Sequence, residues 1–224
     1  MAFLRKREQT AEETLGRLSD GLLRSASGSR IAGGALEIHH PLAPHVDPAA
    51  LQPLCGAFGV SLSLSLDGPA SAGQRVCCES SQLPFQERVF SAVVLHHVVQ
   101  DGSEAELAEA VRVLRRGGVL LVLGLNRYGW QYRSQDASRR LPGFAPLQLR
   151  ARLQQLGMVI QGFAGAGLAG RGAPAFMSRG AGTLGLPFAD LVLLQARHSD
   201  SPEITPLRFR KPRAGVVQSA PMQG

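Results

Sequence analysis

Lysine is almost missing from this chain of 224 residues, in which only two of the 24 basic side chains, Lys6 and Lys211, are lysines. The formal net charge of +7 is therefore carried almost entirely by arginine. Guanidinium groups bind phosphates and nucleic acids well, so this bias is compatible with such a partner. A GC-rich coding sequence produces the same bias, and we favour this second interpretation.

Cysteine is also scarce, with one isolated residue, Cys55, and one adjacent pair, Cys77 and Cys78. An odd number without metal-finger spacing argues against a disulfide framework and favours a reducing compartment. Charged residues from Arg5 to Glu8 with no apolar run after them argue against a signal peptide. No run approaches the roughly 18 apolar residues of a membrane span. We therefore expect a soluble, cytoplasmic protein.

What the chain does contain is a globular composition, 44% hydrophobic, with alternating apolar patterns. We expect strands at 35–38, 60–66, 75–78, 90–95, 119–125, 158–163 and 191–196, and helices at 10–24, 47–58, 103–116 and 146–156. Ser103 and Glu106 have the spacing of a capping box at the start of the third helix. The alternation predicts an α/β fold, a doubly wound, mostly parallel seven-stranded sheet with helices on both faces.

Three regions follow from the same pattern. Residues 1–28 are expected to form an N-terminal amphipathic helix, residues 29–199 the main domain and residues 200–224 a basic flexible tail. The tail contains the sequence P-L-R-F-R-K-P-R, which could contact nucleic acid or an acidic partner. A solvated tail without a partner is the interpretation that we favour. The oligomeric state cannot be inferred from the sequence.

The segment from Glu79 to Asn126 contains an ordered set of motifs: E-S-S-Q-L-P-F, F-S-A-V-V-L-H-H-V and E-A-V-R-V-L-R-R-G-G-V-L-L-V-L-G-L-N. These motifs resemble the core of class I S-adenosylmethionine-dependent methyltransferases. Together with the N-terminal helix and the basic tail, they look like the small YafS-like bacterial branch. The resemblance implies a Rossmann-like sheet whose last strand is antiparallel, S-adenosylmethionine as cofactor, and an unidentified small molecule as methyl acceptor.

The resemblance also implies which residues bind the cofactor. Glu37, in the first strand, is expected to hold the methionine amino group, and Asp67, after the second, to bind the ribose hydroxyls. Glu79 matches the acid that the family uses for the adenine amino group, with Ser80 beside it. Asp67 is also a common turn residue, and Glu79 could be a solvated surface acid.

The turn after the first strand departs from the family pattern. Its usual glycines are replaced by His39, Pro41 and Ala43. Glycine lets a backbone approach a ligand closely, whereas proline removes an N–H donor. A second hypothesis follows: a catalytically degenerate methyltransferase fold that serves as a protein- or nucleic-acid-binding module.

Two histidine pairs end strands that should be neighbours, His39-His40 and His96-His97, with His45 just beyond. We expect the pairs to meet where the strand order of the sheet reverses. His39 and His96 are predicted to line the cofactor pocket, and His96 or His97 to act as a general base. A metal site is a third interpretation, without supporting cysteine or carboxylate spacing. Adjacent strand residues point to opposite faces, so at most one histidine per pair should face the pocket.

Beyond the longest predicted strand, Asn126, Tyr128 and Trp130 are candidates for binding the acceptor, because Trp130 could stack on a flat molecule. A hydrophobic lid is an equally good interpretation. The segment G-A-G-L-A-G from Gly165 to Gly170 fits a dinucleotide-binding pattern, with Asp190 downstream. No helix pattern follows it, so we predict instead a flexible Gly-rich insertion over 162–185.

Overall fold

A computed structural model describes residues 16–19, 21–22, 34–40, 43, 61–65, 75–76, 80–135, 141–168 and 189–199, of which 61–65 and 75–76 are described by their backbone only. The elements are β1 (Ala35–His39), β2 (Ser61–Ser65), β3 (Arg75–Val76), β4 (Phe90–His96), α3 (Glu104–Val113), β5 (Leu114–Asn126), α4 (Trp130–Arg133), β6 (Gly143–Phe144), α5 (Pro146–Gln155), β7 (Met158–Leu168) and β8 (Ala189–His198). Residues 16–19 and 21–22 are also helical.

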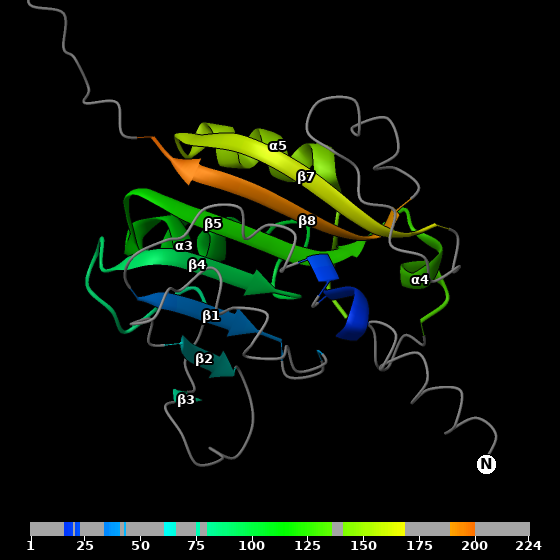
Figure 1. Cartoon of the computed structure of the whole chain (residues 1–224), viewed down its shortest axis with the longest axis horizontal. Coiled ribbons are helices and arrows are strands. Elements are labelled where there is room, and N and C mark those ends of the chain that lie inside the picture. The colour runs from blue at the N-terminus through cyan, green and yellow to red at the C-terminus, as the bar shows by residue number, and fades with distance from the viewer. Residues whose placement is uncertain are drawn as a thin grey trace, which may run out of the picture.

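One sheet runs through the molecule in the order β3-β2-β1-β4-β5-β8-β7, with the short β6 paired to β5 outside this path (Figure 1). The strands from β3 to β5 are parallel, and β8 is antiparallel to both β5 and β7. The prediction of a doubly wound sheet with an antiparallel last strand is confirmed. Strand order reverses at β1, which lies between β2 and β4, so ligands of such sheets bind at the carboxyl edge beside β1 and β4.

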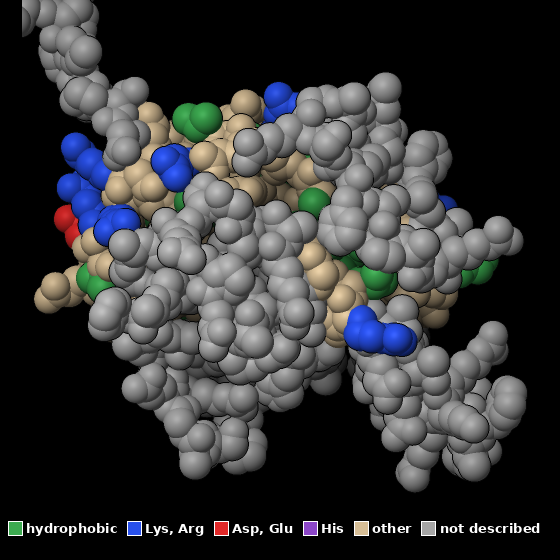
Figure 2. All heavy atoms as spheres, in the orientation of Figure 1, with side chains coloured by type: hydrophobic (Ala, Val, Ile, Leu, Met, Phe, Trp, Pro, Cys, Tyr) green, Lys and Arg blue, Asp and Glu red, His purple; other side chains and the backbone are tan. Residues whose placement is uncertain are grey.

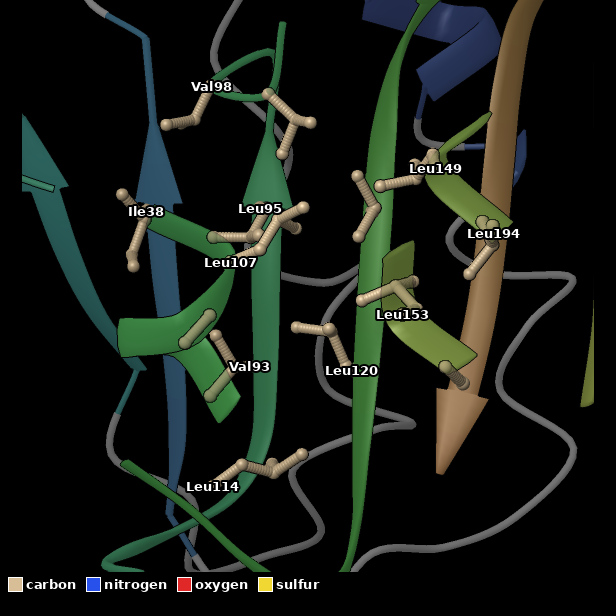
Figure 3. Close-up of a cluster of buried hydrophobic side chains, with 14 of the residues drawn as sticks. Ile38, Val93, Leu95, Val98, Leu107, Leu114, Leu120, Leu149, Leu153 and Leu194 are labelled. Carbon is tan, nitrogen blue, oxygen red and sulfur yellow. The ribbon is translucent and has the colours of Figure 1, made fainter. Parts of the chain in front are cut away.

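Both faces of the sheet are apolar, which is why its central strands are continuous hydrophobic runs rather than alternating ones. On one face α3 and α5 pack Leu107, Leu149 and Leu153 against the sheet (Figure 3). On the other face Leu22, from the N-terminal helical residues, packs in a second cluster with the strand residue Leu121. Part of the predicted helix at 10–24 is therefore present, whereas the predicted helix at 47–58 lies outside the described residues.

The end of α3 differs from the sequence prediction. The helix stops at Val113 instead of Arg116, and the Arg115-Arg116 pair lies inside β5. The reason is strand pairing: Leu114 is already paired with Phe90, and the next pair is Ala92 with Val119, so the residues between form a bulge. Gly117, at φ 70°, is the left-handed residue of this bulge rather than the end of a helix.

The prediction of a capping box at the start of α3 is also wrong. Ser103 does occupy the N-cap position, but its side chain makes no cap hydrogen bond in the described structure. The hydroxyl oxygen instead accepts the Gln100 N–H at 3.1 Å, while the Ser103 N–H is donated to the Gln100 carbonyl. The Ser103 hydroxyl is used in this tight turn before the helix, so it does not make the hydrogen bond that a capping box needs.

The N-terminal and tail boundaries predicted at residues 28 and 200 fall among residues outside the described ranges. None of the helices in the described part of the chain has the length and apolar character that a membrane span needs.

Candidate functional site

The carboxyl ends of β1 and β4 lie side by side, as the sequence predicts. His39 is paired in register with His96, and the His40 N–H is donated to the His96 carbonyl at 3.0 Å. His39 and His96 are both buried. The two histidine pairs therefore do meet at the point where strand order reverses.

His97 departs from strand geometry, and this changes where its ring lies. Its φ of 54° is left-handed, and its N–H is donated to the Leu123 carbonyl at 2.8 Å. The rings of His96 and His97 are consequently in contact, with centroids 4.9 Å apart and an interplanar angle of 50°. The expectation that these two neighbours point to opposite faces is wrong, because it assumed extended backbone at both positions.

The His96–His97 pair is sealed from water and poor in polar partners. Both residues have an exposed fraction of 0%. None of their four ring nitrogens has a hydrogen-bond partner among the described residues. Burial lowers the pKa of His97 well below its ordinary value, and the nearby His96 and His40 lower it further. His97 is thus a neutral imidazole at physiological pH.

Glu37 lies beside this pair. It is buried in β1, and its Oε1 lies 3.6 Å from His96 Nδ1. A carboxylate at this edge has the charge that suits a cationic ligand. Its predicted contact with the methionine amino group stays a prediction.

The turn after β1 closes on itself. The Ala43 N–H is donated to the His40 carbonyl at 2.8 Å, which closes a four-residue turn. Ala43 is buried and packs in the same cluster as Leu22. Two backbone donors of this turn, those of His40 and Ala43, are therefore engaged within the protein. Proline at position 41 has no N–H to donate, whereas a glycine there would have one.

Ser80 is buried. Asp67, Glu79, Pro41 and His45 lie outside the described residues, so their predicted roles stay predictions. Among the described residues, no group of three or more histidine, cysteine, aspartate or glutamate side chains is arranged to hold a metal ion.

The three predicted acceptor residues fall into two environments. Asn126 is fully buried: its Nδ2 donates to the Ala189 carbonyl at 2.9 Å and its Oδ1 accepts the Tyr128 N–H at 3.1 Å. Tyr128 and Trp130 are 49% and 64% exposed. The Arg127 guanidinium carbon lies 5.5 Å from the centre of the Tyr128 ring. Asn126 therefore stabilises the loop after β5 through these two hydrogen bonds. The side chains of Tyr128 and Trp130 are exposed on the same loop.

Asp190 has a role that the sequence analysis missed. Its Oδ1 accepts the Gln131 N–H at 2.9 Å, at the start of α4. Two glycines lie against it: a Cβ on Gly129 would come within 2.9 Å of the carboxylate, and one on Gly167 within 3.2 Å. Asp190 therefore holds the segment that carries Trp130. Nothing in the sequence indicates this role, because Gly129, Gly167 and Gln131 are all distant from Asp190 along the chain.

Gly165 and Gly167 lie within β7, so they are strand residues and form no phosphate-binding turn. This agrees with rejecting a dinucleotide site. Residues 158–163 are strand as predicted, whereas the flexible insertion predicted beyond them is wrong for residues 164–168, which continue β7; the rest of it lies outside the described residues. Glycine is tolerated here because neighbouring groups approach the backbone closely.

Replacing Asp190 by alanine should loosen α4. The Gln131 N–H would lose its acceptor at a cost of about 1–2 kcal/mol, and the only tryptophan of the chain, Trp130, would report it. We expect lower fluorescence anisotropy of Trp130 and easier acrylamide quenching. Asp190→Asn keeps an oxygen acceptor and is the control; equal anisotropy in Asp190→Ala and the wild type would contradict the assignment.

A small cavity lies beside this edge, on the face covered by α3 and α5. Its volume is about 50 Å³, and the residues around it include Val99, Gln100, Phe144 and Gln148. Ion pairs between Arg127 and Asp101 and between Arg152 and Glu104 tie the surrounding segments together. The cavity has room for a few waters and is far too small for an adenosyl group.

Comparison with known proteins bears on the segment that carries these residues. Residues 59–122 match the family model described as a methyltransferase domain. The match runs from β2 to β5 and includes Ser80 and both residues of the His96–His97 pair. It covers less than half of the chain. No curated protein matches the chain by sequence.

Solved structures share the fold. A 1,6-didemethyltoxoflavin-N1-methyltransferase of Burkholderia thailandensis, solved with its substrate and S-adenosylhomocysteine, aligns with a TM-score of 0.54 and 15% identity, covering 89% of this chain and 84% of that one. The YcgJ protein of Bacillus subtilis gives 0.54 and 12%, covering 82% and 99%. The [4+2]-cyclase SpnF gives 0.50 and 14%, covering 80% and 79%. At sequence identities this low, the similarity shows a shared fold and no shared activity.

Proposed function

We propose that this protein is an S-adenosylmethionine-dependent methyltransferase that acts on a small-molecule acceptor. The observation that carries the proposal is the placement of Glu37, His39 and the buried His96–His97 pair at the carboxyl edge of β1 and β4. This is the edge where doubly wound sheets bind ligands. The match of residues 59–122 to a methyltransferase domain supports it. The narrower YafS-like assignment and the cytoplasmic location stay predictions.

The charges at this edge suit a cationic cofactor. S-adenosylmethionine supplies an activated methyl group on a positively charged sulfur. Glu37 would hold its ammonium group, and Asp67, Glu79 and Ser80 would hold the ribose and adenine. A charged imidazole beside a sulfonium would be repelled, so the neutral state of His97 is the state that such a pocket requires.

The residues of the chain act mainly by positioning and by excluding water. Methyl transfer depends on alignment of the acceptor atom with the methyl carbon and the sulfur. Because His96 and His97 are sealed from water, their first proposed role is to form the pocket wall. A general base is the second proposed role, through the unprotonated ring nitrogen of the neutral His97. Tyr128 and Trp130 would contact the acceptor through their exposed side chains in the loop after β5.

A second candidate function is a binding module without catalysis. The observation that favours it is the turn after β1, where the N–H groups of His40 and Ala43 are already bonded within the protein. Cofactor affinity is expected to be weaker than with a glycine-rich turn. The fold also occurs in a protein named as a [4+2]-cyclase, so the architecture alone does not fix the reaction.

Titration calorimetry with S-adenosylhomocysteine separates the two functions. For the enzyme we expect micromolar binding that Glu37→Gln or Glu79→Ala weakens at least tenfold, because each removes one charged contact worth about 1.4 kcal/mol or more. Glu87→Gln, an exposed acid between the Leu-Pro-Phe segment and β4, is the matched control and should bind normally. Absence of heat up to millimolar ligand would reject the enzyme and favour the module.

A further inference from the structure

The sheet ends in two edge strands of very different length. At one end lies β3, which has two residues, and at the other lies β7, which has 11 (Figure 1). Among the described strands β7 pairs only with β8, so its outer side presents backbone N–H and C=O groups that no described strand binds. A long edge strand of this kind is a template on which another strand can add.

β7 lacks most of the features by which proteins prevent such pairing. Its sequence, M-V-I-Q-G-F-A-G-A-G-L, contains no charged residue and no proline, although a bulge lies between Ile160 and Gly162. The Val159 side chain is 57% exposed, and those of Ile160 and Phe163 are partly buried. Figure 2 shows hydrophobic side chains, and no acidic ones, among the described atoms at the upper side of the molecule, where β7 lies. The edge is therefore uncharged and partly apolar, which favours a protein strand as its partner.

The order of side-chain sizes along β7 fits a second copy of the same strand. The amino half carries the larger side chains of Val159 and Ile160, the carboxyl half carries Gly165 and Ala166, and Phe163 lies between them. When two copies run antiparallel about Phe163, the larger side chains of each copy lie opposite the small residues of the other. A twofold axis through this point, perpendicular to the sheet, produces the arrangement, and such twofold symmetry is the commonest symmetry of homodimers.

We propose that the outer edge of β7 is the interface of a homodimer, in which β7 pairs antiparallel with the β7 of the partner subunit and the two sheets become one. A single pair of strands is a small interface, so the dimer is expected to dissociate on dilution. The proposal does not rest on methyl transfer, because the candidate site at β1 and β4 is separated from β7 by β5 and β8.

Sedimentation velocity of the full chain at concentrations from about 1 to 100 µM tests the proposal. We expect monomer at the lowest concentration and dimer at the highest. Val159→Glu should weaken the dimer at least tenfold, because strand pairing would bury the added charge. Arg197 lies opposite Val159 in β8, so the glutamate has a basic neighbour in the monomer and the variant should fold. Val89→Glu is the matched control: Val89 is also exposed, at 49%, but precedes β4, and its variant should dimerise like the wild type.

Hydrogen exchange of the wild type provides a measurement that needs no variant. Alternate amides of residues 159–167 should exchange more slowly at about 100 µM than at about 1 µM, whereas those of β1 and β4 should exchange at the same rate at both concentrations. Three results would overturn the proposal. These are equal dimerisation of Val159→Glu and Val89→Glu, protection that rises with concentration outside β7 but not within it, and a monomer at every concentration. The last result would favour an extended peptide of another protein as the strand that completes this edge.

Discussion

Unfolding by urea is expected to need far less denaturant at pH 5 than at pH 7.5, because His97 is held neutral in the fold. Its pKa is lowered in the native state, first by burial and then by His96 and His40. Below about pH 6.5 the unfolded chain therefore binds a proton that the native protein does not. Stability is full above this pH and falls by about 1.4 kcal/mol for each pH unit below it, until the native pKa of His97 is reached.

His97→Asn should flatten this dependence. Asparagine does not titrate and tolerates the left-handed backbone found at position 97, so the variant removes the proton without forcing the turn. At pH 7.5 it should be less stable than the wild type because packing is lost, and the difference should shrink or reverse at pH 5. Val98→Ala loses packing next to His97 without removing an ionisable group. It should keep the wild-type slope, and parallel curves for wild type and His97→Asn would contradict the explanation.

Arg112→Leu is expected to destabilise the protein by about 1–3 kcal/mol, because it releases the loop before β4. Arg112 donates to the Phe85 carbonyl at 2.9 Å and to the Leu83 carbonyl at 3.1 Å. It also donates hydrogen bonds to both carboxylate oxygens of Glu109. The Oε2 of Glu109 accepts the Leu83 N–H at 3.0 Å as well. Without the guanidinium, two carbonyls lose this donor, and the Glu109 carboxylate loses its bonds to Arg112 and keeps the one from the Leu83 N–H. A third of the Arg112 side chain is exposed, which limits the loss.

Urea unfolding and amide hydrogen exchange measure this effect. Exchange should speed up at Leu83, whose N–H depends on the placement of Glu109. Arg115→Leu is the matched control, since Arg115 is exposed, and its stability should change by about 0.5 kcal/mol or less. If both variants unfold at the same urea concentration, the Arg112–Glu109 pair does not hold the loop.

The Arg112–Glu109 pair makes a second contribution to stability that is lost in acid, at a lower pH than the contribution of His97. Hydrogen bonds from Arg112 and from the Leu83 N–H lower the pKa of Glu109 against the opposing effect of burial. The stabilisation is therefore complete above the ordinary glutamate pKa of about 4.3 and is lost as pH falls below it. It is separated in pH from the contribution of His97. Ser80 lies three residues before Leu83 in the segment that leads to β4, so loosening this segment should also weaken the binding of any ligand that Ser80 contacts.

The strands and α5 could be predicted because their signals are local. Runs that are apolar at every position predict strands buried on both faces, as β4, β5 and β8 are. α5 begins with Pro146 and is followed by Gly157 at φ 76°, which are ordinary start and stop signals. The meeting of His39 and His96 followed from strand order alone.

The errors arose where a distant partner decides the local structure. The Arg115-Arg116-Gly117 sequence is typical of a helix end, yet pairing of Leu114 with Phe90 begins the strand there. Nothing in a His-His sequence indicates the left-handed backbone of His97. The Glu109–Arg112 spacing predicts an ion pair but not that the pair holds Leu83 and Phe85, which lie 26 to 29 residues away. Asp190 was likewise recognisable only once Gln131 was beside it.

The position of β8 in the sheet has a consequence for biosynthesis. β8 is the last strand of the described chain, yet it lies between β5 and β7, which are both made before it. Until the ribosome has added residues 189–198, β5 lacks its partner on one side and β7 lacks β8, so both strands present unsatisfied amide and carbonyl groups. Completion of the sheet therefore coincides with the end of translation of this region. A product truncated before β8 would expose one unpaired edge of β5 and would leave β7 without β8.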